Sequence, residues 1–113
     1  MNLHAAVSNN PILVLTNLPD QHSAQELAHI LISENLAACV NILAPCTSVY
    51  RWHEKIEHGN EVPLLIKTTE QRYAALQEAI CRHHPYELPE VIHVPITGGL
   101  PAYLEWLTGE TII

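Results

Sequence analysis

Residues 11–31 read PILVLTNLPDQHSAQELAHIL, a short apolar segment followed at once by an amphipathic one. The apolar run that ends at Thr16 predicts a strand with both faces covered. The next four residues, Asn17-Leu18-Pro19-Asp20, have the composition of a turn. Ser23 and Glu26 have the S-x-x-E spacing of a capping box, after which apolar residues recur every three or four positions. The stretch therefore predicts a strand, a turn and a helix.

The second half of the chain repeats this arrangement. Segment 61–68 predicts another strand, in which Pro63 indicates an edge position or a bulge because proline has no amide proton to donate. The helix predicted after it has an apolar face and ends at Pro85. That face is formed by Tyr73, Leu76 and Ile80.

Three further strands and a terminal helix complete the predicted order. Segments 37–43 and 47–57 predict two strands, and His58-Gly59-Asn60 predicts the hairpin turn after them. Segment 91–96 predicts the last strand, and Pro101 the start of a short helix. The order β-α-β-β-α-β is that of the ferredoxin-like α+β fold. Two helices would cover one face of the sheet, and other copies of the chain the second face.

Length and composition favour one soluble domain. The chain has 113 residues, of which 48% are apolar and 15% charged. We expect residues 1–10 to form a flexible arm and residues 11–113 a single domain. No signal peptide or membrane-spanning segment is predicted, so a membrane is not an expected partner. Three cysteines without a C-x-x-C motif favour a reducing cytoplasm.

The balance of charges excludes one class of partner. Five Lys and Arg residues stand against twelve Asp and Glu residues, which gives a formal net charge of −7. Nucleic acid repels such a chain, and no basic stripe compensates. An acidic surface attracts cations, and the eight His residues are able to bind transition metals when neutral.

Several short motifs follow one another in a recognisable order. They are Leu36-Ala37-Ala38-Cys39-Val40-Asn41, Tyr50-Arg51-Trp52 with Lys55, Glu61-Val62, Ile66-Lys67-Thr68, His84-Pro85-Tyr86-Glu87, Pro89-Glu90 and Tyr103-Leu104-x-Trp106. In these motifs the chain resembles the CutA divalent-cation-tolerance family across residues 11–107. The resemblance implies a ferredoxin-like protomer, a tight homotrimer similar to PII-type signalling proteins, and an association with copper and divalent-cation tolerance.

The resemblance also implies a metal site. Family members with a proposed copper site carry two His at the end of the second helix, here His83 and His84, and a Cys in the first strand, here Thr16. Thiolate is a good ligand for Cu(I), whereas the hydroxyl of Thr16 is a poor one. The resemblance therefore supports the His ligands of the site and weakens the case for the ligand in the first strand. Adjacent side chains on a helix diverge by about 100°. The alternative interpretation is that the two His residues bond free carbonyls at the helix end.

A second predicted site lies at a cleft between subunits. Its candidate residues are Trp52, Glu61, Lys67, Glu90 and Tyr103. Their charges either hold a small ligand or protect the edges of the sheet. We expect no enzyme and no organic cofactor, because no nucleophile, acid and base converge in the sequence. The leading expectation is a trimeric protein that binds copper or another divalent ion weakly. The alternative is a PII-like module that binds an anionic metabolite and no physiological metal.

Overall fold

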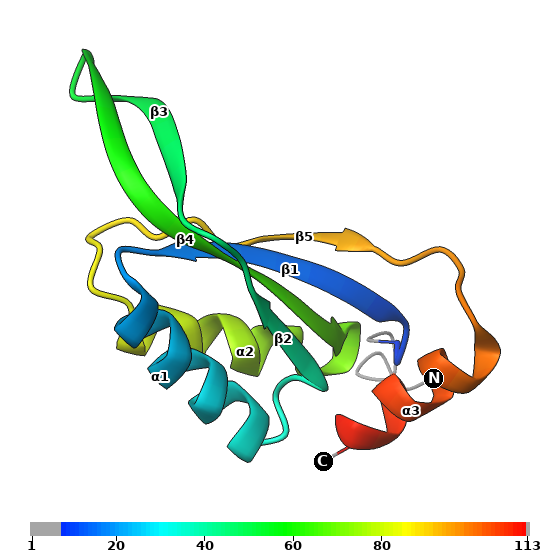
Figure 1. Cartoon of the computed structure of the whole chain (residues 1–113). Coiled ribbons are helices and arrows are strands. Elements are labelled where there is room, and N and C mark those ends of the chain that lie inside the picture. Colours follow the sequence, from blue (N-terminus) through cyan, green and yellow to red (C-terminus); the bar gives the residue numbers. More distant parts are fainter. Residues whose placement is uncertain (1–7, 113) are drawn as a thin grey trace, which may run out of the picture.

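The computed structural model describes residues 8–112, in which five antiparallel strands form a sheet with two helices against one face (Figure 1). The elements are β1 (Pro11–Leu18), α1 (Gln21–Ser33), β2 (Cys39–Ile42), β3 (Cys46–Trp52), β4 (Lys55–Thr69), α2 (Glu70–His83), β5 (Ile92–Pro95) and α3 (Pro101–Glu110). The five strands and three helices follow the predicted sequence of segments, although the strand predicted over 47–57 ends at Trp52, and β2 and β3 counted as one interrupted strand give the order β-α-β-β-α-β. The α+β prediction is confirmed.

The structure describes only the last part of the predicted N-terminal arm. Most of the predicted N-terminal arm, residues 1–7, lies outside the described residues. Asn10 accepts a hydrogen bond at its carbonyl from the amide of Glu70, so the chain just before β1 is tied to the start of α2.

None of the helices within residues 8–112 has the length and apolar character needed to cross a membrane.

The sheet has the strand order β2-β4-β1-β5, and β3 pairs with the first half of β4. β4 is therefore an inner strand, and the edge position predicted from Pro63 is wrong. Pairing with β2 ends at Leu64, and pairing with β3 begins at Glu61. Three residues, 43–45, therefore lie opposite only two residues of β4, Val62 and Pro63, which makes a bulge. At this bulge the amide of Leu43 donates a hydrogen bond of 2.9 Å to the carbonyl of Pro63. The bulge alternative describes the position correctly.

The hairpin β3–β4 turns at His53 and Glu54, which have positive φ angles of 50° and 68°. Left-handed conformations at both residues of a two-residue loop match the right-handed twist of the strands. The predicted turn at His58-Gly59-Asn60 is wrong, because these residues lie within β4 and pair with residues 47–49. A Cβ at Gly59 would lie 3.7 Å from the Cε1 atom of Tyr50, an ordinary van der Waals contact, and its φ is not positive, so neither space nor backbone conformation demands glycine there.

The first helix begins earlier than its predicted capping box. Asp20 is the N-cap, and its Oδ1 atom accepts a hydrogen bond of 2.7 Å from the amide of Ser23. The box at Ser23 and Glu26 is therefore wrong, and Glu26 pairs instead with His22 at 2.6 Å. The bond from Ser23 lowers the pKa of Asp20. The charged cap therefore stabilises the fold above about pH 3.8 and loses this effect as the pH falls further.

Alternation along the strands separates a buried face from an exposed one. Every second residue of β1 is fully buried against the helices, and the residues between them are half-buried. We call the surface opposite the helices the open face. Its apolar residues, aligned by the strand register, are Leu13 and Leu15 of β1, Leu65 of β4, and Ile92 and Val94 of β5. Ile92 is 53% exposed and Val94 46%, so apolar groups face solvent there.

Candidate functional site

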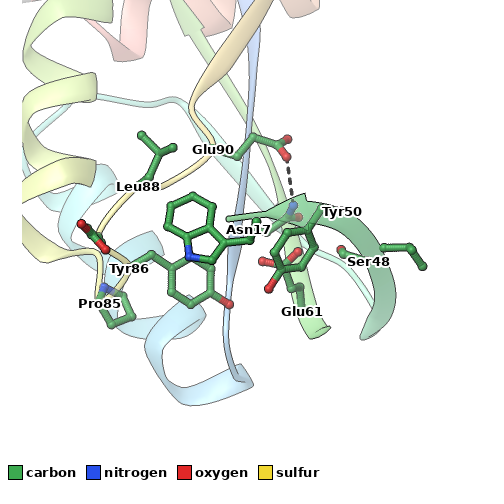
Figure 2. Close-up of a pocket in the computed structure, with 11 residues that line it drawn as sticks. Asn17, Ser48, Tyr50, Glu61, Pro85, Tyr86, Leu88 and Glu90 are labelled. Atoms are coloured by element: carbon green, nitrogen blue, oxygen red, sulfur yellow. Dashed lines mark hydrogen bonds between the residues drawn. The ribbon is translucent and has the colours of Figure 1, made fainter. Parts of the chain in front are cut away.

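A pocket of about 780 Å3 opens where the base of the β3–β4 hairpin meets the end of β1 and the segment between α2 and β5 (Figure 2). We call it the acidic pocket. It is lined by Asn17, Ser48, Val49, Tyr50, Trp52, Glu61, Pro85, Tyr86, Glu87, Leu88 and Glu90. Three stretches far apart in the sequence therefore build one site, and the twist of the long hairpin brings them together.

The charges of the acidic pocket all have one sign. Glu61, Glu87 and Glu90 line it, and within residues 8–112 no Lys, Arg or His side chain does. Glu90 is oriented by Asn17, whose amide nitrogen donates to its Oε1 atom at 3.4 Å (Figure 2). Carboxylates without a basic partner attract cations and repel anions. The electrostatics of the pocket therefore favour a cationic ligand.

Aromatic rings form the second part of the lining. Figure 2 shows Tyr50, Tyr86 and Glu61 gathered on one side of the pocket. Burial, together with the nearby negative charge of Glu61, raises the pKa of Tyr86 to about 12. The phenol therefore stays protonated at neutral pH, and the pocket keeps a neutral ring beside its carboxylates.

We expect Tyr86 to lose its proton near pH 12, as measured from the ultraviolet absorbance difference between the wild type and Tyr86→Phe. The folded pKa lies above the ordinary value of 10.0, so the protonated phenol stabilises the fold below pH 10 and this stabilisation is lost as the pH rises towards 12. Glu61→Gln should lower the pKa of Tyr86 only in part, because burial remains. Glu87→Gln is the matched control, and an equal shift in both variants would contradict the specific role of Glu61.

His84 fixes one wall of the acidic pocket. Its Nε2 atom lies 2.7 Å from the carbonyl oxygen of Asn17, and its Nδ1 atom lies 3.2 Å from the amide nitrogen of Tyr86. The amide can only donate, so Nδ1 accepts, Nε2 carries the proton and the ring is neutral. These two bonds join the end of β1 to the segment that follows α2. The position of Tyr86 is therefore set by His84.

Within one described chain, the predicted metal ligands His83, His84 and Thr16 are not brought together. His84 is buried with both nitrogens bonded, whereas His83 is exposed, so the two side chains diverge as expected. Thr16 is buried on the helix-facing side of β1 and offers a neutral hydroxyl in place of a thiolate. To bind a metal, His84 would have to give up both bonds. Within residues 8–112, no three His, Cys, Asp or Glu side chains are grouped so as to hold an ion.

The predicted cleft residues divide between three places. Trp52, Glu61 and Glu90 line the acidic pocket, as a common site requires. Lys67 lies instead on the open face, with its ammonium group against the Asn41 side chain and 3.9 Å from the sulfur of Cys39. Tyr103 lies on α3, where its ring is 5.5 Å from that of Trp106. Within one chain, neither Lys67 nor Tyr103 belongs to the pocket.

Sequence reasoning did not place Asn17, Tyr86 and Glu87 in the site, nor the remaining lining residues, which are Ser48, Val49, Tyr50, Pro85 and Leu88. Asn17 was assigned only to a turn, although it orients Glu90. Tyr86 and Glu87 lie in an irregular segment between α2 and β5, where no periodicity shows which way a side chain points. The only sequence signal for them is the motif that contains His84 and Pro85.

Comparisons with known proteins show what the chain as a whole is similar to. The model of the family described as CutA1 divalent ion tolerance protein matches residues 12–110. The divalent-cation tolerance protein CutA of Citrobacter koseri is 43% identical over 99 residues, which cover 88% of this chain and 86% of that protein. The chloroplastic protein CutA of Arabidopsis thaliana is 42% identical over 88% of this chain and 55% of its own length. The crystal structure of CutA from Xylella fastidiosa superposes with a TM-score of 0.89 at 42% identity, covering 91% of this chain and 99% of that one.

Proposed function

Because the chain belongs to the CutA1 divalent ion tolerance protein family, we propose that it is a non-enzymatic, homotrimeric protein that binds cations in the acidic pocket. The observation that carries this proposal is a pocket lined by three carboxylates and, among the described residues, by no basic side chain. The relatives are named as tolerance proteins, which suits a binding role. We also propose a cytoplasmic location, because cysteines without a pairing motif suit a reducing compartment.

Divalent ions of the hard class fit the pocket better than copper does. Carboxylate and amide oxygens, here from Glu61, Glu90 and Asn17, are ligands that Mg2+, Mn2+ and Ca2+ prefer. The carboxylates do not close around one point, so the ion keeps part of its water shell and is held weakly. Copper bound by His83, His84 and Thr16 stays a prediction from the family resemblance. The bonds already made by His84 argue against it.

Titration of the protein with Mn2+ by calorimetry tests the proposal. We expect the double variant Glu61→Gln with Glu90→Gln to bind Mn2+ at least about tenfold more weakly, because two of the three pocket charges are gone. Glu105→Gln with Glu110→Gln is the matched control, since it removes the same charge from exposed positions of α3. Equal Mn2+ affinities in the two double variants would show that binding depends only on the net charge of the protein. The pocket would then not be the binding site.

The homotrimer is supported by the open face. Ile92, Leu15 and Leu65 form one apolar row across three strands, and Val94 and Leu13 begin a second. Helices α1 and α2 cover only the opposite face (Figure 1). Contact with other copies of the chain would remove this apolar surface from water, which is the largest favourable term in association.

A further inference from the structure

We propose that the acidic pocket binds an organic ammonium ion, whose charge is held between the carboxylates and the faces of the aromatic rings. This inference names a ligand class for the pocket and rests on the proposed function only in using the same site. The occupant is a small alkylammonium compound that carries no negative group. The charge, the size and the aromatic lining of the pocket each point to it.

The size of the acidic pocket exceeds what a metal ion needs. Its volume of about 780 Å3 is in the range of small-molecule sites, roughly 300–1,000 Å3. A bare or partly hydrated ion would leave most of that space to solvent. The carboxylates are also spread around the wall and do not converge on one point. An organic cation can contact the dispersed carboxylates and the rings directly, whereas a metal ion reaches them in part through its water shell.

The aromatic rings supply what an ammonium ion requires beyond charge. Tyr50, Trp52 and Tyr86 line the pocket together with the three carboxylates. The face of an aromatic ring carries negative charge density and attracts a cation within about 6 Å of its centre. The backbone amide of Tyr86 bonds His84, and the two rings lie 4.7 Å apart, so the Tyr86 ring is packed against His84 before a ligand arrives. Leu88 and Val49 offer apolar contact to alkyl groups.

An anionic metabolite does not fit the same wall. Phosphate and carboxylate ligands are held in proteins by Lys, Arg or backbone amides at helix starts. The basic residue that the sequence predicts for the cleft is Lys67. It lies on the open face of the same chain and bonds Asn41. In the described part of the chain, the lining has only negative ionisable groups and tyrosines. The sign of the charge therefore separates this proposal from the PII-like alternative.

Titration of the full chain with tetramethylammonium chloride tests the proposal, with tert-butanol as a neutral ligand of similar shape. Trp106→Phe serves as the background, so that Trp52, which lines the pocket, becomes the only tryptophan and reports binding by its fluorescence. We expect saturable binding of tetramethylammonium and none of tert-butanol. Tyr86→Leu should weaken tetramethylammonium about 2- to 30-fold, which is the range of one cation–π contact. Tyr50→Leu is a second variant in case Tyr86→Leu does not fold.

The control variant and the competing ligands decide the inference. Tyr103→Leu, a tyrosine of similar exposure on α3, should leave the affinity unchanged. If tert-butanol binds as tightly as tetramethylammonium, or if neither pocket tyrosine matters, the proposal is overturned. Mn2+ binding separates it from the proposed function, because Tyr86→Leu should keep the Mn2+ affinity while it weakens the binding of tetramethylammonium. If the wild type binds tetramethylammonium but does not bind Mn2+, only the proposed function is overturned.

Discussion

Replacing Val94 by aspartate is expected to convert the homotrimer into a folded monomer. Val94 lies on the open face opposite Leu13 and is 46% exposed in the single chain. In a trimer closed through this face, the new carboxylate would be taken out of water without a partner, which costs several kcal/mol. Light scattering coupled to size exclusion should give the wild type three times the 12.6 kDa of one chain, and the variant one chain mass.

Ile32→Asp is the matched control for this experiment. Ile32 is 42% exposed, but it lies on α1, in the layer on the other side of the sheet. The control should keep the trimer mass, and circular dichroism should show that both variants are folded. A wild-type chain that remains a folded monomer in dilute solution would contradict the homotrimer, as would a trimeric Val94→Asp variant.

The topology was predictable because the strands and helices that decide it have clear periods. β1 and the second half of β4 are nearly continuous apolar runs, and both become inner strands of the sheet. The two amphipathic helices each follow such a strand. Once these units are fixed, the pairing of β1 with β4 brings both helices to one face. The local signals therefore agree with the global fold.

The hairpin was mispredicted because its turn lacks the usual residues. Glycine and asparagine are the common signals of a tight turn, and both occur at 59–60. The turn instead uses His53 and Glu54, which seldom adopt positive φ. Residues 58–60 instead pair with residues 47–49 as part of the strand. Strand pairing thus overrides a local turn preference at this point.

The candidate site was predictable in part, at Trp52 and Glu61 on strands and at Glu90 in the segment before β5. Glu61 and Lys67 point to the same face of β4, but six residues separate them by about 20 Å along the strand. A pocket within one chain therefore does not hold both. Tyr86 and Glu87 lie in an irregular segment, where the side-chain direction depends on the bonds of His84. Those bonds depend on the carbonyl of Asn17, a contact between segments 67 residues apart.

Thr16→Val is expected to stabilise the protein, and Thr68→Val to destabilise it, although both threonines are buried on the same face of the sheet. The Thr16 hydroxyl has no hydrogen-bond partner within residues 8–112, whereas the Thr68 hydroxyl donates to the Leu36 carbonyl at 2.7 Å. A buried polar group without a partner costs about 1–3 kcal/mol, and so does removing the partner of a buried carbonyl. We therefore expect changes in the free energy of unfolding of about that size and of opposite sign.

Denaturant unfolding at one fixed protein concentration measures both changes, since association shifts the apparent stability. Each variant is the other's control, because valine has nearly the shape of threonine and both sites exchange the same hydroxyl for a methyl group. If Thr16→Val destabilises as much as Thr68→Val, the Thr16 hydroxyl must have a partner in solution, such as a buried water or a bound ion. Stabilisation by Thr16→Val would mean that the Thr16 hydroxyl has no partner in solution and that this position serves packing.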